Sequence, residues 1–132
     1  MKEGWIGDDY IILFEEESSL LDEGYAVADF LSGYQLVGLR SWDDFIVQDS
    51  RGIKFTVPTV PLLAAHLRRL DLEFRPADLV ADQGITGRIK WYIKPVCFGG
   101  DPNAGPNLQW VTLEQHTQLV KWWNQKYREL AP

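Results

Sequence analysis

The sequence predicts an α+β fold: a mainly antiparallel sheet with helices packed on it and a long C-terminal helix. Short segments in which apolar and polar residues alternate indicate strands, and turn-forming residues separate them. The most regular helical spacing of apolar residues follows Thr112. The chain has 132 residues, of which 45% are hydrophobic and 24% charged, so we expect one domain over residues 1–132.

The N-terminal part predicts one strand and one short helix. Residues 10–14 form an apolar run that ends in three glutamates, and we expect a strand there. Residues 25–31 predict a short helix, with Gly33 placed to end it in a left-handed cap. Gly24 makes a longer helix over residues 18–31 costly, because glycine has a low helix propensity.

The middle of the chain predicts three strands, over residues 34–39, 45–48 and 53–57. The last two flank the loop DSRG, which favours a hairpin. Gly52 accepts a positive φ angle, and the Asp49 side chain can accept hydrogen bonds from the main chain of its own loop.

The second half predicts two further helices and a strand. Pro61 suits the first turn of a helix over residues 61–70, because its missing N–H has no partner there in any case. Residues 71–88 look irregular, and residues 89–94 alternate as a strand does. The last helix is expected over residues 112–130.

This last helix has a clear start signal and a clear apolar face. Thr112 and Gln115 have the spacing of a capping box. Trp122 is expected to point away from the apolar face. The residues that recur at helical spacing on that face are Leu113, His116, Val120, Trp123, Tyr127 and Leu130.

Residues 95–110 contain the single cysteine and a Gly-Gly pair, and we interpret them as a structured turn. A phosphate-binding loop would need a lysine, and this segment has no basic residue but does have Asp101. Cys97, between Val96 and Phe98, is expected to be a buried, inert thiol.

Other catalytic and metal sites find little support. His66 and His116 are far apart in the sequence and lack the paired spacing of a zinc site, so no metal or other cofactor is expected. Asp43 and Asp44 form either a carboxylate pair or a turn, and the turn is favoured. Alternating basic and aromatic residues at 90–94 resemble an RNA-binding strand, but a net charge of −6 argues against nucleic acid.

The negative charge is concentrated at the N-terminus, where residues 1–31 carry nine acidic side chains against one basic one. Such a block either solvates the surface or attracts a basic partner over long range. One cysteine cannot form an intramolecular disulfide, and the N-terminus lacks the layout of a signal peptide. We therefore expect a cytoplasmic protein that does not insert into membranes.

Two stretches resemble the SUKH superfamily, which includes many bacterial immunity proteins of toxin systems. Residues 30–62 carry the apolar pair Phe30 and Leu31, a following strand, and then Asp-x-x-Gly at Asp49. Residues 98–125 are similar to the loop and last helix of such proteins. The resemblance implies an α+β fold, no catalysis, and a role in binding and neutralising a toxin.

The functional hypothesis is therefore a non-enzymatic protein-binding module that neutralises a cognate toxin, such as a basic nuclease. Trp5, Trp42 and Trp122 are candidate anchors where they are exposed. The alternatives are a small enzyme centred on Cys97 or the aspartate pair, and a regulatory domain that binds a peptide at a sheet edge. The oligomeric state stays open. The candidate partner-binding residues are Asp8, Asp9, Glu15, Glu16, Glu17, Asp22, Glu23, Trp42, Asp43 and Asp44.

Overall fold

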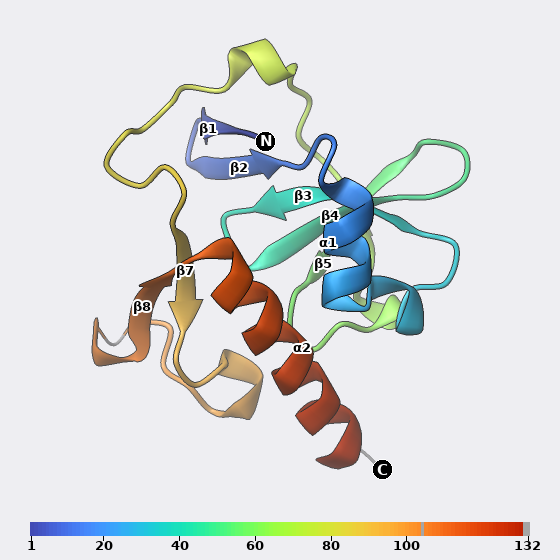
Figure 1. Cartoon of the computed structure of the whole chain (residues 1–132), viewed down its shortest axis with the longest axis vertical. Helices are drawn as coiled ribbons and strands as arrows, with labels where there is room; N and C mark the ends of the chain where they lie inside the picture. The colour runs from blue at the N-terminus through green and yellow to red at the C-terminus, as the bar shows by residue number, and fades with distance from the viewer. Residues whose placement is uncertain (104, 131–132) are drawn as a thin grey trace.

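A six-stranded antiparallel sheet, with its strands in chain order, dominates the computed structural model, which describes residues 1–103 and 105–130 (Figure 1). Its strands are β1 (Lys2–Ile6), β2 (Asp9–Leu13), β3 (Gln35–Arg40), β4 (Asp44–Gln48), β5 (Lys54–Pro58) and β6 (Arg68–Arg69). A second sheet pairs β7 (Ile89–Tyr92) with β8 (Leu108–Val111). The α-helices are α1 (Ser18–Tyr25) and α2 (Leu113–Leu130). The predicted α+β class is confirmed.

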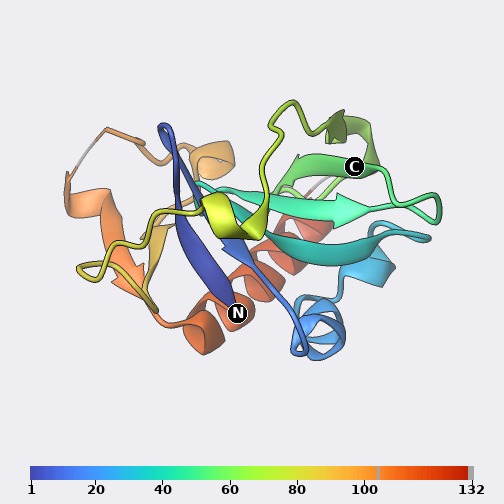
Figure 2. The same cartoon turned by 90° about the horizontal axis from the view of Figure 1, so that it is seen from above.

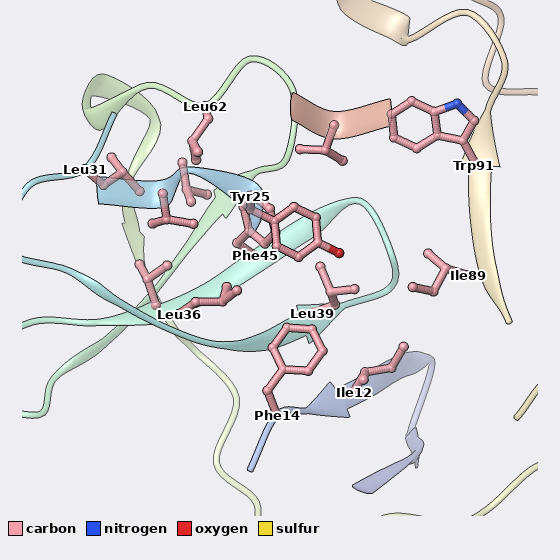
Figure 3. Packing of buried hydrophobic residues seen from close by; sticks show 14 of the residues in the cluster. Ile12, Phe14, Tyr25, Leu31, Leu36, Leu39, Phe45, Leu62, Ile89 and Trp91 are labelled. Carbon is pink, nitrogen blue, oxygen red and sulfur yellow. The ribbon is translucent and has the colours of Figure 1, made fainter. Parts of the chain in front are cut away.

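Both α-helices lie on one face of the large sheet, and the segment that follows β6 crosses the other face (Figures 1 and 2). The core fills the space between helices and sheet, where Tyr25 of α1, Phe45 of β4 and Trp91 of β7 converge (Figure 3). Val120 of α2 belongs to the same cluster. One apolar core thus joins the two sheets and the two helices.

Hydrogen bonds confirm two predicted local features, the hairpin loop at Asp49 and the capping box at Thr112. Asp49 Oδ1 accepts hydrogen bonds from the N–H groups of Arg51 and Ile53 at 2.9 and 3.0 Å. At the start of α2, Gln115 N–H donates to the Thr112 hydroxyl at 3.1 Å, and Thr112 N–H donates to Gln115 Oε1 at 3.0 Å. Hairpin and capping box both depend on residues close in sequence.

The helix predicted over residues 25–31 is only partly confirmed, because α1 lies earlier and ends at Tyr25, and only one 3₁₀ turn, Val27–Asp29, forms within the predicted range. Ala26, with φ of 58°, provides the left-handed cap that the sequence assigned to Gly33. Gly24 stands inside α1, and a Cβ atom there would lie 3.1 Å from Thr117 Cγ2 of α2. The close approach of the two helices therefore outweighs the poor helix propensity of glycine.

The helix predicted over residues 61–70 is wrong, and only one 3₁₀ turn, Ala64–His66, forms there. Arg68–Arg69 instead pairs with β5, and Leu70 N–H donates to the Lys54 carbonyl at 3.1 Å. The main-chain groups that a helix would use are thus taken by the edge of the sheet. Propensity and spacing do not reveal such long-range competition.

Strand β8 differs from the sequence-based prediction, which gives a structured turn over residues 95–110 and then the approach to α2. Asn107 anchors the start of β8: its Oδ1 accepts from Lys94 N–H at 2.8 Å and its Nδ2 donates to the Lys94 carbonyl at 3.0 Å. β8 has only four residues, too few for alternation to be recognised from sequence.

Candidate functional site

The turn between β3 and β4 places two candidate residues, Trp42 and Asp43, in a constrained backbone. Ser41 and Trp42 have φ angles of 49° and 64°, a left-handed conformation that non-glycine residues rarely adopt. Ser41 N–H donates to the Tyr10 carbonyl at 2.6 Å, and the Asp43 carbonyl accepts from Thr59 N–H at 2.9 Å. Strain held by surrounding contacts is common at functional sites.

The Trp42 side chain is held in an aromatic cluster that connects the two sheets. It stacks on Tyr10, with ring centroids 5.0 Å apart, and meets Trp5 and Trp110 edge to face at 5.9 and 5.3 Å. Its Nε1 is buried without a hydrogen-bond partner among the described residues. The indole therefore fixes the turn of one sheet against β8 of the other.

The Asp43 carboxylate faces β7 across this junction. The Tyr92 hydroxyl donates to Asp43 Oδ2 at 3.5 Å, the long limit of a hydrogen bond. Partial loss of hydration and the nearby charge of Asp44 raise the pKa of Asp43 to about 6, although Lys90 and Tyr92 act in the opposite direction. Asp43 forms no ion pair within the residues that the structure describes.

Asp43 borders a cleft of about 270 Å³ between the two sheets, hereafter the carboxylate cleft. Its walls are aromatic rings, prolines and aliphatic side chains, with the carboxylates of Asp43 and Asp44 among them. An apolar stem that ends in a cation suits such walls, because aromatic faces attract cations and a carboxylate pairs with them. The lining residues are Trp42, Asp43, Asp44, Pro58, Thr59, Val60, Trp91, Tyr92, Pro95, Val96 and Pro102.

A larger hollow of about 590 Å³ lies on the opposite face of the large sheet, under the segment after β6. It is mainly apolar, and its charged residues are two lysines and two glutamates, Lys2, Lys54, Glu15 and Glu73. Because the two signs balance, this hollow favours no particular charge on a ligand. The carboxylate cleft has the more specific chemistry despite its smaller volume.

The ten candidate partner-binding residues fall into two separate groups. The first group, called the end group, consists of Asp8, Asp9, Trp42, Asp43 and Asp44, and the two turns that carry it lie at the same end of the large sheet. The second group, called the α1 group, lies beyond the other end of β2 and consists of Glu15, Glu16, Glu17, Asp22 and Glu23. The length of β2 separates the groups by about 13 Å at about 3.3 Å per residue.

The end group is held together by hydrogen bonds and charge. Asp9 accepts from Arg40 Nε and Nη2, both at 3.2 Å, and from the Ser41 hydroxyl at 3.1 Å. The pKa of Asp44 is raised, chiefly by partial burial and further by the charge of Asp9, while Arg40 and Arg68 oppose the shift. Arg40 thus pairs with Asp9 and, at 2.8 Å, with Asp71, whereas Asp43 forms no ion pair within the part of the chain that the structure describes.

Three of the five side chains in the α1 group make contacts within the protein. The amino group of Met1 lies 3.7 Å from Glu15 and 3.3 Å from Glu17. Main-chain hydrogen bonding, followed by the Met1 amino group, lowers the pKa of Glu17. Asp22 accepts a hydrogen bond from Leu36 N–H at 2.9 Å, while Glu16 and Glu23 are exposed. These side chains serve the fold in part and leave a diffuse negative surface.

The tryptophan anchors differ in exposure. Trp122 is 53% exposed, and so it points away from the core as expected. Trp5 and Trp42 are only partly exposed, inside the aromatic cluster. Trp110, 43% exposed, was missed because β8 was missed. The sequence suggests Tyr92 only as part of an RNA-binding strand, and no local signal places it beside Asp43.

The structure contradicts the expectation for Cys97 and agrees with the expectation for His116. Cys97 is exposed, so the expectation of a buried thiol is wrong, because Val96–Phe98 forms a surface 3₁₀ turn and not a strand end. Partial loss of hydration raises the pKa of the thiol, which disfavours the reactive thiolate. His116 is fully buried and hydrogen-bonded to the Tyr25 hydroxyl at 2.7 Å, as expected of a core residue.

Residues 1–103 and 105–130 contain no group of three or more His, Cys, Asp or Glu side chains arranged to hold a metal ion. Within the same ranges no helix combines the length and the apolar character needed to cross a bilayer. Comparisons of the chain with protein-family models, with curated proteins and with solved structures found no match.

Proposed function

We propose that this protein is a non-enzymatic binding module that receives a lysine or arginine side chain of a partner protein in the carboxylate cleft. The observation that carries the proposal is the Asp43 carboxylate, which lies between aromatic and proline side chains and forms no ion pair among the described residues, although the charge of Lys90 acts on it. Asp43 supplies the anion, Trp42 and Tyr92 supply aromatic faces, and Val96 forms an exposed apolar rim.

An incoming cation would relieve an unfavourable state of the free protein. The Asp43 carboxylate loses hydration on partial burial, and the long hydrogen bond from Tyr92 and the charge of Lys90 do not fully compensate, so the pKa of Asp43 stays raised. A guanidinium or ammonium group beside Oδ2 would form an ion pair with the carboxylate and so compensate for the lost hydration. Its aliphatic stem would pack on the apolar walls of the cleft.

The surrounding acidic residues support the same type of partner. Asp8, Asp9 and Asp44 belong to the same end of the sheet, and the α1 group extends the negative field beyond it. Such a field attracts basic surfaces, accelerates association and loses strength at high salt. We assign the contact to the cleft and long-range steering to the α1 group.

The biological role that fits this chemistry is that of an immunity protein, as the resemblance to the SUKH superfamily implies. The partner would then be a basic toxin, such as a nuclease, whose active surface is covered on binding. A toxin gene beside the gene for this protein, and rescue of cells that express it, are the expected observations. Rescue by the wild type but not by Asp43→Asn would link protection to the cleft.

The chemistry of the cleft can be tested before a partner is known. Random peptides displayed on phage would be selected on the wild type and, in parallel, on Asp43→Asn. The proposal predicts enrichment of lysine or arginine next to apolar residues on the wild type and loss of that enrichment on the variant. Equal enrichment on both proteins, or none on either, would refute it.

One observation favours a second function, that of a small enzyme in which Asp43 is a general acid or base. A carboxyl group with a pKa of about 6 beside a tyrosine hydroxyl is suited to proton transfer near neutral pH. Asp43→Asn separates the two functions. A catalytic Asp43 predicts that the variant still binds its ligand but no longer converts it, whereas a binding Asp43 predicts loss of affinity.

A further inference from the structure

Strand β8 presents an unpaired edge at the margin of the molecule (Figure 1). Ile93 N–H donates to the Asn107 carbonyl at 2.8 Å, which identifies this pair as hydrogen-bonded. In antiparallel sheets hydrogen-bonded pairs alternate, so Gln109 and Val111 also turn their main-chain groups towards β7. The main-chain groups of Leu108 and Trp110 therefore point outward, and no described residue bonds to them.

The outer strands of the large sheet are protected in ways that β8 is not. β1 is bridged by Val80, whose N–H and carbonyl bond to Trp5 at 3.0 and 2.8 Å. β6 is a pair of arginines, and exposed positive charges discourage edge pairing. β8 has the sequence LQWV, with neither a charged residue nor a proline. Its four residues make it a short edge, but it lacks the charge, proline or covering segment that protects the other edges.

We propose that β8 pairs with β8 of a second copy of this chain, antiparallel and with Gln109 opposite Gln109 of the second copy. In this register Leu108 of each copy forms a hydrogen-bonded pair with Trp110 of the other. The two N–H and two carbonyl groups that point outward on each strand are then all satisfied. The two small sheets join into one four-stranded sheet across a two-fold axis, as in many homodimers.

The side chains along this edge include exposed apolar groups that a second copy could bury. Ile93, Trp110 and Trp122 are 48%, 43% and 53% exposed, and they lie on or beside the small sheet. Gln109, Leu119 and Trp122 are among the residues that line a hollow of about 460 Å³ next to β8.

The distribution of charged residues also favours a second copy of this chain as the partner of β8. The lining of this hollow contains no charged residue, whereas the net negative charge of the protein lies in residues 1–31, where nine acidic side chains stand against one basic one. Two copies can therefore meet through β8 with little repulsion, although the net charge of each is −6. The self-complementary main-chain pattern and the neutral surface together favour a second copy over a charged segment of another protein.

Charge-pair variants of the full chain test this inference. Sedimentation velocity over a range up to about 1 mM should show the wild type as a monomer–dimer equilibrium. Gln109→Lys and Gln109→Glu each place like charges opposite one another, and should each weaken dimerisation at least about tenfold. Mixed in equal amounts, the two variants should form a heterodimer and recover most of the lost affinity.

Gln109 is exposed, so both variants should fold, which circular dichroism would verify. Recovery in the mixture cannot result from misfolding and identifies Gln109 as facing its own counterpart. A wild type that stays monomeric at the highest concentration would overturn the proposal and leave the edge to an extended segment of another protein. Single variants that dimerise as strongly as the wild type would overturn it as well.

Discussion

The Tyr92 hydroxyl of β7 lies 3.5 Å from Oδ2 of Asp43, in the turn that joins β3 to β4. The two residues are 49 positions apart in the chain, Asp43 in a turn of the large sheet and Tyr92 in a strand of the small one. Their approach forms one side of the carboxylate cleft, together with the aromatic cluster around Trp42. The proposed binding function depends on the charge of this one carboxylate.

Asp43→Asn should stabilise the protein near neutral pH while it abolishes binding of basic ligands. The folded-state pKa of Asp43 is raised from 3.8 to about 6, so the fold disfavours the charged form. The gain should be about 1 kcal/mol at about pH 7.5, allowing for solvent screening, and should disappear as the pH falls from about 6 to below 4. Urea denaturation across this range measures it.

Asp71→Asn provides the matched control, because Arg40 lowers the pKa of Asp71 and the fold therefore favours its charge. This substitution should leave stability unchanged or slightly reduced near neutral pH. A destabilised Asp43→Asn protein would show that the carboxylate serves the fold, contrary to the binding proposal.

His116 should make the protein sensitive to acid. Complete burial lowers the pKa of His116 from 6.5 to about 3, so the folded protein holds the neutral ring and the unfolded chain takes up a proton first. The stability that this ring contributes is full above pH 6.5, falls as the pH drops below 6.5, and is reduced by about 3 kcal/mol at about pH 4. Chemical denaturation from pH 7 to 4 measures the slope.

His116→Gln keeps a polar side chain but cannot take up a proton in this range. Its stability should therefore be lower than that of the wild type at pH 7 and should depend less on pH between 6.5 and 4. Equal slopes in the two proteins would mean that other groups cause the loss in acid.

Asn124→Leu should destabilise the protein by about 2–4 kcal/mol. The Asn124 side chain is buried; its Oδ1 accepts from Leu62 N–H and its Nδ2 donates to the Thr59 carbonyl, both at 2.8 Å. Leucine leaves both main-chain groups without a partner. Gln125→Leu, at an exposed position of the same helix, should change the free energy of unfolding by less than about 0.5 kcal/mol. Similar effects at the two sites would contradict this role of Asn124.

Gly24 and Thr117 should be energetically coupled. Alanine at position 24 favours the helix by about 1 kcal/mol, but its Cβ would lie 3.1 Å from Thr117 Cγ2. Gly24→Ala alone should therefore gain little or lose stability, whereas the same change combined with Thr117→Ser, which lacks that methyl group, should recover most of the gain. A double-mutant cycle measures the coupling, and additive effects would rule out the proposed contact.

The elements that could be predicted from the sequence depend on neighbouring residues. The loop after β4 needs Asp49 and Gly52, and α2 needs Thr112 and Gln115. The failures come from contacts distant in sequence. The approach of Thr117 allows Gly24 inside α1, and pairing with β5 draws Arg68–Arg69 out of the expected helix.

The candidate site was only partly predictable for the same reason. The list of acidic residues included Asp43, but composition could not show that β2 separates the end group from the α1 group. Tyr92 and Trp110 join the site only when β7 and β8 pair beside the β3–β4 turn. No pattern within either segment indicates that meeting.

The pKa of Asp43 in the presence of a basic ligand tests the central claim most directly. It would be measured from the ¹³C chemical shift of the Asp43 carboxyl group, with and without a saturating oligoarginine peptide, and with oligoglutamate as the control. Because a bound cation favours the charged carboxylate, oligoarginine should lower the pKa from about 6 towards 3.8, and oligoglutamate should not lower it. A pKa that stays near 6 in saturating oligoarginine would contradict the proposed binding site.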